Sequence, residues 1–264
     1  AGMKKMLGAI GDLPQLSSEE YEIERAKSLN ERRGELEGEH CPRCLDKGYI
    51  AEVKDGVVKT SECICMARRR SLARIRKSGL GDMLARYTFD AWKTPEEWQK
   101  KAYSKAQDYL QNGTGKWFVA TGCVGSGKSH LCTAICGKLL NGGLEVRSML
   151  WLHLGSRLNA AINDTEEYRR LLQPLKTTKV LYIDDFLKAG KSGVTQGDIN
   201  LAFELLNYRY NDRKLITVIS SELTIEQIMD IDEAVGSRIY ERSRDYYLKF
   251  TGNKNWRLKN HDRP

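Results

Sequence analysis

A run of eight residues near the middle of the chain has the residue types and spacing that bind phosphate. It reads GCVGSGKS from Gly122 to Ser129 and fits the pattern G-x-x-x-x-G-K-[ST]. Its glycines let backbone N–H groups converge on phosphate oxygens, Lys128 would reach the β- and γ-phosphates of a nucleotide, and the Ser129 hydroxyl is a ligand for Mg²⁺. The predicted nucleotide-binding residues here are Gly122, Cys123, Val124, Gly125, Ser126, Gly127, Lys128, Ser129 and His130.

The flanking sequence supplies the elements that such a loop needs. Residues 116–121 are mostly apolar and β-prone, and residues 130–140 carry apolar side chains at helical spacing. The loop is therefore expected between a buried strand and a helix N-terminus, where the helix dipole adds partial positive charge. A glycine-rich turn that binds nothing is the alternative, and it does not require this order of elements.

Two acidic residues could provide the other half of the site. Asp184 and Asp185 follow the apolar run 180–183. A carboxylate at the end of a parallel strand lies beside the phosphate-binding loop, where Mg²⁺ needs an oxygen ligand. We assign Asp184 to Mg²⁺, directly or through water, and Asp185 to orienting or deprotonating the attacking water.

Four of the seven cysteines lie in two tight pairs, Cys41 with Cys44 and Cys63 with Cys65. Two thiolate pairs separated by a loop of this size can close a tetrahedral zinc site. The residues between them predict a β-hairpin, with Asp-Gly at 55–56 in the turn, that brings the pairs together. Few apolar residues lie here, so a structural zinc ion would supply folding energy. His40 could replace one thiol, but four sulfurs are preferred; unliganded buried cysteines are the alternative.

Further candidate residues follow the acidic pair. Arg238 and Arg242 lie four residues apart on one predicted helical face. An arginine that reaches a neighbouring subunit's nucleotide would stabilise transition-state charge, which implies self-association. A surface ion pair with Glu241 or Glu233 is the alternative. Residues 220–222 end a strand and either sense the γ-phosphate or cap the next helix.

Composition limits the class of protein. The chain has 264 residues, of which 41% are hydrophobic and 30% charged, as expected of a soluble globular protein. Its formal net charge of +8 favours a polyanionic partner such as nucleic acid, although general solubility explains it equally well. No apolar run approaches the ~20 residues that span a bilayer, so no membrane partner is expected. Seven cysteines without a visible secretory signal predict a reducing, cytoplasmic location.

Three parts are expected along the chain. Residues 1–65 contain a helix from Glu19 to about Arg33, started by a capping box at Ser17 and Glu20 and ended by Gly34, followed by the cysteine module. Residues 66–86 form a basic helical linker that is either solvated or in contact with phosphate. Residues 87–264 form the nucleotide-binding domain.

In residues 87–264, segments with the hydrophobic pattern of a β-strand alternate with segments that have helical spacing. Strands are expected at 116–121, 144–150, 180–185, 215–221 and 246–250. Helices are expected after the first of these and at 95–110, 152–161, 165–172, 198–211 and 224–243. This alternation predicts an α/β fold whose parallel sheet of five strands has helices on both faces.

The ordered set of motifs resembles the DnaC/DnaI-type replicative helicase loaders of the AAA+ superfamily, which include phage and plasmid versions. The IstB-type transposase helper ATPases share the same core. The resemblance covers nearly the whole chain. It rests on the four cysteines and on the segments 87–89 (YTF), 122–130, 182–185 (YIDD), 206–210 (LNYRY) and 237–242 (SRIYER).

The resemblance implies an AAA+ P-loop ATPase preceded by a zinc module that binds a hexameric DnaB-type helicase. It implies that the ATPase domain binds ATP and single-stranded DNA, that Phe89 belongs to the nucleotide site, and that Arg257 touches the γ-phosphate. Arg238 or Arg242 would supply the arginine finger. Glu222 stands where the family often has a polar amide, and Asp185 where many AAA+ enzymes have Glu. Both departures predict slow hydrolysis or a different trigger for it.

Contacts with DNA are expected on the helix after the second strand. The candidates are His153, Ser156 and Arg157, with Lys188 and Lys191 on the loop after the acidic pair. A solvated helix and loop is the alternative for each of them.

Three functions remain open from the sequence. The first is an ATP-switched loader that passes a replicative helicase to single-stranded DNA. The second is a transposition helper that binds duplex DNA, whose usual N-terminus lacks this cysteine set. The third is a non-enzymatic, zinc-containing nucleic-acid binder.

Overall fold

The computed structural model describes residues 17–77, 81–190, 193–252 and 255–256, and the chain divides into two compact units, Ala1–Met66 and Ala67–Pro264. The first unit carries the paired cysteines, and the second carries the GCVGSGKS loop. Helix α2 (Ile64–Lys77) begins in the first unit and continues in the second. Within the described ranges, no helix is both long and apolar enough to cross a membrane.

The first unit contains one helix and one hairpin. Helix α1 (Ser18–Glu31) begins with the predicted capping box: the Glu20 N–H donates to the Ser17 hydroxyl at 3.2 Å, and the Glu20 carboxylate accepts from the Ser17 N–H at 2.8 Å. Strands β1 (Tyr49–Lys54) and β2 (Val57–Glu62) pair antiparallel. The predicted Asp-Gly turn is confirmed, because both of its residues have positive φ, 56° and 75°, as a type I′ turn requires.

Polar contacts hold α1 to the hairpin. The Asn30 side chain accepts from the Ala51 N–H at 2.9 Å and donates to the Ala51 carbonyl at 2.8 Å. Glu22 accepts from the Val58 N–H at 2.8 Å. Among the described residues of this unit, the buried apolar side chains are all small, namely Ala26, Cys44, Ala51 and Cys63. So little apolar burial leaves the unit in need of another source of stability.

Gly34 has a different role from the predicted one. Helix α1 ends at Glu31 and Arg32 is already extended, so Gly34 does not end the helix. The Gly34 N–H instead donates to the Leu45 carbonyl at 2.7 Å, and a Cβ at Gly34 would lie 2.2 Å from the carbonyl oxygen of Asp46. Only glycine permits this close approach of two backbone segments.

The second unit is built on a sheet of five strands in which every neighbouring pair is parallel, in the order β4-β5-β6-β3-β7. The strands are β3 (Phe118–Gly122), β4 (Val146–Leu150), β5 (Val180–Asp184), β6 (Ile216–Ser221) and β7 (Tyr247–Phe250). The predicted α/β class and parallel sheet are confirmed. Because β6 pairs with both β3 and β5, the loops that follow these three strands meet at one end of the sheet.

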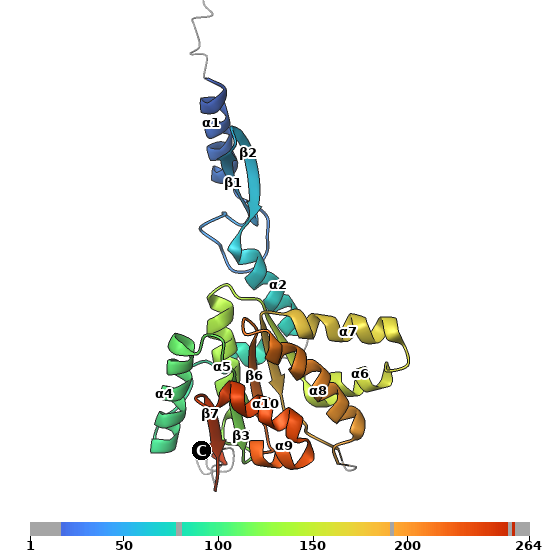
Figure 1. Ribbon diagram of the computed structural model, residues 1–264. Helices are drawn as coiled ribbons and strands as arrows, with labels where there is room; N and C mark the ends of the chain where they lie inside the picture. The colour runs from blue at the N-terminus through green and yellow to red at the C-terminus, as the bar shows by residue number, and fades with distance from the viewer. Residues whose placement is uncertain (1–16, 78–80, 191–192, 253–254, 257–264) are drawn as a thin grey trace, which may run out of the picture. The chain divides into compact units, whose positions relative to one another are not determined.

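Helices cover both faces of this sheet (Figure 1). Helices α2 to α5 lie against one face, around a cluster that includes Tyr109, Phe118 and Leu131, and α6 to α10 lie against the other, around Trp117 and Leu205. The helices not yet bounded are α3 (Gly81–Arg86), α4 (Glu97–Asn112), α5 (Lys128–Asn141), α6 (Ser156–Ala160), α7 (Thr165–Thr177), α8 (Gln196–Asn211), α9 (Ile225–Ile231) and α10 (Glu233–Ser243). Both faces of the sheet are therefore buried, as is usual for parallel strands.

Two of the predicted helices are divided in the structure. The helix expected at 152–161 starts as a π-helical turn, η1 (Trp151–Gly155), before α6 begins. The helix expected at 224–243 breaks at Asp232, which is extended and whose carboxylate accepts from the Val235 N–H at 2.7 Å. Asp232 thus caps α10 and changes the direction of the chain.

Candidate nucleotide site and candidate metal centre

The loop between β3 and α5 has the backbone shape that its glycines make possible. Gly122, Gly125 and Gly127 have φ angles of 105°, 73° and 88°, in the region that other residues rarely adopt. A Cβ at Gly122 would lie 2.1 Å from the carbonyl oxygen of Phe250. Helix α5 begins at Lys128, directly after the loop, so the amides of its first turn are available to an anion.

The lysine and serine of the loop are both held in place. Lys128 Nζ donates to the carbonyl oxygens of Gly122 at 2.9 Å and Cys123 at 2.8 Å. Ser129 Oγ donates to Asp184 Oδ1 at 2.9 Å. The structure therefore brings the hydroxyl of the loop to the first acid after β5, although the two residues are 55 positions apart in the chain.

Asp184 is buried, and its Oδ1 atom is a shared acceptor. Besides Ser129, the Tyr182 hydroxyl donates to it at 2.6 Å, and the Ser220 hydroxyl donates to it as well. Adjacent ligands of octahedral Mg²⁺ lie about 2.9 Å apart, because each metal–oxygen bond is about 2.0–2.1 Å long. The hydroxyl of Ser129 and the carboxylate of Asp184 therefore fit a Mg²⁺ ion as neighbouring ligands.

Asp185 lies in different surroundings from Asp184. Its φ of 53° turns the chain sharply after β5, and its N–H donates to Ser220 Oγ at 3.1 Å. Its carboxylate pairs with Lys188 at 3.0 Å, and Lys188 also pairs with Glu222 at 2.9 Å. One aspartate of the pair is thus buried against the loop, while the other belongs to an ionic cluster at the surface of a cavity.

This cavity has a volume of about 300 Å³ and is lined by residues 124–130 of the loop and α5, together with Asp185, Lys188 and Glu222. Its ring-bearing residues are Tyr87, Trp92, Trp98, His130 and Trp256. The His130 ring stacks on Tyr87, with 4.9 Å between ring centroids, and meets Trp92 edge-on at 5.2 Å. A cavity with a phosphate-binding loop and aromatic rings suits a nucleotide, whose base is planar and apolar.

Two residues predicted to belong to the nucleotide site, Phe89 and Arg257, are not among the described residues that line the cavity. The Phe89 side chain is buried in the apolar core and meets Tyr103 edge-on at 5.5 Å, so its assignment to the site is wrong. Its neighbours Tyr87 and Trp92 line the cavity instead. Arg257, predicted to touch the γ-phosphate, lies outside the described residues.

The tryptophans of the cavity are not among the site residues predicted from the sequence. Three of the five tryptophans of the chain, Trp92, Trp98 and Trp256, line it. Trp92 also contacts the loop directly, because a Cβ at Gly127 would lie 2.7 Å from its ring. Trp92 precedes helix α4 and Trp98 lies in its first turn, so neither adjoins the loop in the sequence and no local pattern marks them as site residues.

The sequence of this chain matches the model of a known protein family. Residues 56–261 match the family of IstB-like ATP binding proteins. The chain belongs to this family. Among its relatives, the phage-like element PBSX protein XkdC of Bacillus subtilis is 30% identical over 222 residues, which are 80% of this chain and 82% of XkdC. The replicative helicase loader DnaC of Escherichia coli K12 is 25% identical over 189 residues, 70% of this chain and 72% of DnaC.

Solved structures share the fold of this IstB-like protein. The crystal structure of DnaI has a TM-score of 0.53 at 21% identity and covers 64% of this chain and 93% of that chain. The replication initiator DnaA, bound to AMPPCP and single-stranded DNA, has a TM-score of 0.52 at 18% identity, with coverages of 64% and 51%. The predicted resemblance and the predicted AAA+ ATPase class are confirmed by the family and the fold together.

The two candidate finger arginines on helix α10 of this IstB-like protein differ in exposure and in their hydrogen-bond partners. Arg238 is partly exposed; its Nε donates to Asn207 Oδ1 at 3.0 Å, and its guanidinium lies 5.0 Å from the centroid of the Phe203 ring. Arg242 is only 1% exposed. Its guanidinium donates to the backbone carbonyls of Gly115, Arg209, Tyr210 and Leu215. The assignment of Arg242 as a finger is therefore wrong, because a guanidinium enclosed by its own chain cannot reach a neighbouring subunit.

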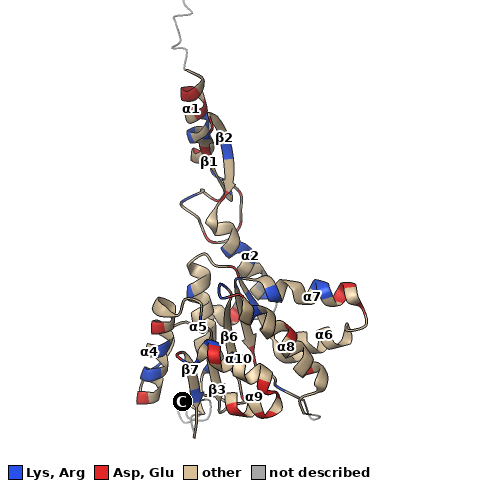
Figure 2. Cartoon of the chain, in the orientation of Figure 1, with Lys and Arg blue, Asp and Glu red and all other residues tan. Residues whose placement is uncertain are grey.

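The candidate DNA contacts lie on η1 and α6. His153, Ser156 and Arg157 are all exposed, and the Ser156 hydroxyl donates to the Leu152 carbonyl at 2.6 Å. Lysines and arginines are also present on α2, α4 and α7, so positive charge is spread over several elements (Figure 2). Lys188 belongs to the wall of the nucleotide cavity, and Lys191 lies outside the described residues.

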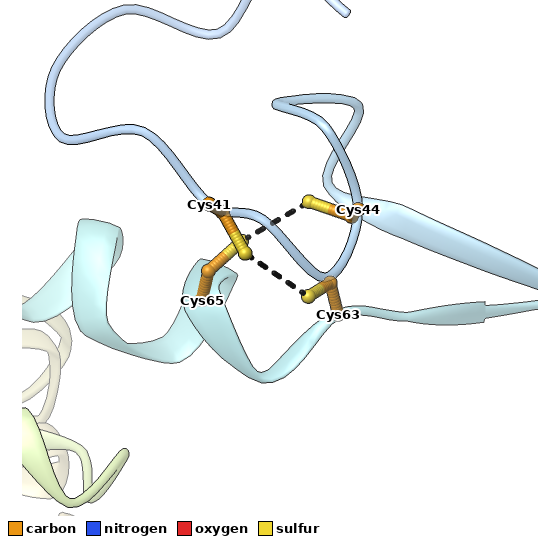
Figure 3. Close-up of side chains that lie close together, drawn as sticks. All are labelled: Cys41, Cys44, Cys63 and Cys65. Atoms are coloured by element: carbon orange, nitrogen blue, oxygen red, sulfur yellow. Dashed lines mark hydrogen bonds between the residues drawn. The ribbon is translucent and has the colours of Figure 1, made fainter. Parts of the chain in front are cut away.

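The four paired cysteines gather at one end of the hairpin (Figure 3). Their Sγ atoms all lie within 4.8 Å of one another, with Cys41 and Cys63 3.9 Å apart and Cys44 and Cys65 3.6 Å apart. Four sulfurs bound to zinc at about 2.3 Å lie about 3.8 Å from each other in a tetrahedron. The donor set and its dimensions therefore fit a zinc ion.

The backbone around the cysteines supports this cluster. Burial opposes ionisation of the Cys44 thiol, but the Gly48 N–H, 3.4 Å from its sulfur, and the neighbouring thiols lower its pKa to about 7. Asp46 accepts from the Cys41 N–H at 2.8 Å and lies 2.7 Å from His40 Nδ1. His40 thus supports the loop through Asp46 and lies outside the set of four sulfurs.

Proposed function

We propose that this protein is an ATP-dependent loader that binds a hexameric DnaB-type replicative helicase and delivers it to single-stranded DNA. The observation that carries the proposal is the 2.9 Å contact of Ser129 with Asp184 beside the loop-lined cavity of an ATP-binding family member. The similarity to the replicative helicase loader DnaC supports the helicase as partner. In this proposal residues 1–65 are the zinc-containing helicase-binding module, 66–86 the linker and 87–264 the ATPase domain.

The residues in and beside the cavity have separate roles in ATP hydrolysis. Lys128 neutralises charge on the β- and γ-phosphates, and Ser129 and Asp184 hold the Mg²⁺ ion, which supplies further neutralisation of phosphate charge. Asp185 orients the attacking water and accepts its proton. Aspartate has a shorter side chain than glutamate and reaches the water less well, so hydrolysis is slow.

Self-association completes the site in this proposal. Arg238 contributes its guanidinium to the nucleotide of a neighbouring subunit, because its contacts with Asn207 and Phe203 hold it on a partly exposed face of α10. The exposed residues of η1 and α6, His153, Ser156 and Arg157, contact the backbone of single-stranded DNA. ATP favours the assembled, DNA-bound state, and hydrolysis releases the helicase.

The helicase-binding surface is the exposed apolar part of the zinc module. Tyr21 and Ile23 on α1 are 59% and 52% exposed, and Val57 on β2 is 50% exposed. The hydrogen bond from the Val58 N–H to Glu22 joins α1 and β2 next to these exposed residues, since Glu22 lies between Tyr21 and Ile23 and Val58 follows Val57. Exposed apolar side chains on a small unit favour a protein partner over solvent.

Binding of a purified DnaB-type hexamer to the full chain, measured by interferometry with ATP and Mg²⁺, tests the proposal. We expect binding by the wild type and at least about tenfold weaker binding by a Tyr21→Ala/Ile23→Ala variant, the size of effect expected when anchor residues are truncated. Tyr240, exposed on α10, supplies the control, since Tyr240→Ala leaves the helicase-binding surface intact. No binding by the wild-type protein with ATP and Mg²⁺ contradicts the helicase partner.

The family match favours one second candidate, an IstB-like transposition helper that acts on duplex DNA. The match covers residues 56–261 and leaves Cys41 and Cys44 outside it. A helper predicts ATP-dependent binding that is tighter to duplex than to single-stranded DNA, whereas the loader predicts the reverse. Fluorescence anisotropy with matched oligonucleotides distinguishes the two.

A further inference from the structure

A cluster of three charged residues lies in the wall of the nucleotide cavity. Lys188 Nζ donates to Asp185 Oδ2 at 3.0 Å and to Glu222 Oε1 at 2.9 Å. All three residues line the cavity, and their side chains are only partly exposed, at 40%, 27% and 38%. The cluster therefore faces any ligand that the cavity holds.

The fold fixes this cluster in place. Asp185 follows β5 and Glu222 follows β6, and these two strands are parallel neighbours. The turn after Asp185 has a second residue with positive φ, Leu187 at 54°, and closes with a bond from the Lys188 N–H to the Asp185 carbonyl at 2.9 Å. Phe186 and Leu187 are buried in the core and fix this turn in place. The turn therefore directs Lys188 into the wall of the cavity.

The two carboxylates of the cluster act on the phosphate-binding lysine. Burial lowers the pKa of the Lys128 ammonium, and the negative charges of Glu222 and Asp185 partly oppose that shift. A terminal phosphate held by Lys128 therefore meets these carboxylates as well. Without Lys188 they would repel it, because like charges at short range in a partly buried site are unfavourable.

We propose that Lys188 is the residue that recognises the terminal phosphate of ATP, with Asp185 and Glu222 holding its ammonium in the cavity. An ammonium group has three N–H donors, and the two carboxylates take two of them. The third is available to a phosphate oxygen. The proposal rests on the ATP site proposed above and adds to it a means of distinguishing ATP from ADP.

Titration of the full chain with fluorescent mant-AMPPNP and mant-ADP, both with Mg²⁺, tests this role. We expect Lys188→Ala to weaken mant-AMPPNP binding about tenfold or more and mant-ADP binding less than about twofold, since one charge-assisted hydrogen bond to the terminal phosphate is lost. Lys188→Arg keeps the charge and should keep most of the preference. Lys249→Ala removes a surface ion pair with Glu226 outside the cavity and serves as the control.

Glu222→Gln provides a second variant in case Lys188→Ala fails to fold. It removes one negative charge from beside the phosphates but keeps an amide oxygen that accepts from Lys188, so mant-AMPPNP should bind about two- to fivefold tighter while mant-ADP changes less. Equal changes for the two nucleotides in both variants, or no change in either, overturn the role of Lys188. Failure of the wild type to bind mant-AMPPNP with Mg²⁺ instead refutes the ATP site itself.

Discussion

Large apolar side chains fill both faces of a sheet in the ATPase unit, whereas four thiols and a few small side chains occupy the centre of the cysteine unit, residues 17–66. Trp117, Phe118, Leu131 and Ile219 are fully buried around the sheet. Among the described residues 17–66, Cys44 and Cys63 are buried to the same degree, and the other buried apolar side chains are alanines. The ATPase unit can therefore fold by hydrophobic burial, whereas the cysteine unit buries too few apolar side chains to fold by burial alone.

This difference also separates the two kinds of site. The nucleotide cavity is lined mainly by loops and helix ends that a packed sheet positions. The cysteine cluster is both the site and the core of its unit. Replacing a residue that binds the nucleotide should therefore prevent nucleotide binding and leave the ATPase unit folded. Replacing one of the four cysteines should unfold the unit that contains them.

The largest expected effect comes from removing one zinc ligand. Cys63→Ser should abolish the bound zinc and unfold residues 17–66, because structural zinc contributes on the order of 10 kcal/mol in small domains. Zinc content by atomic emission should fall from one ion per chain to none, and limited proteolysis should cleave the module while the ATPase unit resists.

Cys136→Ala is the matched control, because Cys136 is buried in α5 of the other unit. It should keep its zinc and its protease-resistant module. A Cys63→Ser chain that keeps a resistant module would refute the dependence on metal.

A smaller effect, on stability within the ATPase unit, comes from its buried arginine. Arg242→Ala leaves four backbone carbonyls without their donor, so we expect it to lower the free energy of unfolding by about 3 kcal/mol or more in urea titrations. Arg238→Ala should cost less than about 1 kcal/mol, because Arg238 is partly exposed, while reducing ATPase activity as expected of the proposed arginine finger. Equal stability of the two variants would contradict the structural role of Arg242.

Local sequence rules predicted the parts of the fold that depend on neighbours in the chain. The capping box of α1 and the Asp-Gly turn lie within four residues of their partners, and both were found where expected. The pattern of the phosphate-binding loop is read from its own glycines, lysine and serine and from the helix that follows. These features are encoded within one short segment, so the sequence sufficed.

Features that depend on distant segments were missed or mistaken. Gly34 is required by the approach of residues 45 and 46, and Arg242 by carbonyls up to 127 positions away. Spacing along a helix placed Arg238 and Arg242 on one face but could not tell which of them the rest of the unit would enclose. The three tryptophans and Lys188 reach the cavity from separate segments of the chain, among them helix α4 for Trp98, and no local pattern shows that these segments meet.

The central claim is that Asp184 and Ser129 hold the metal of a bound triphosphate, and Asp184→Asn tests it most directly. Asparagine keeps an oxygen that accepts from Ser129, Tyr182 and Ser220 but loses the negative charge. In titrations with mant-ATP, Mg²⁺ should tighten binding to the wild type relative to EDTA by about tenfold or more, and that gain should be lost in the variant. The same gain from Mg²⁺ in both proteins would contradict the account.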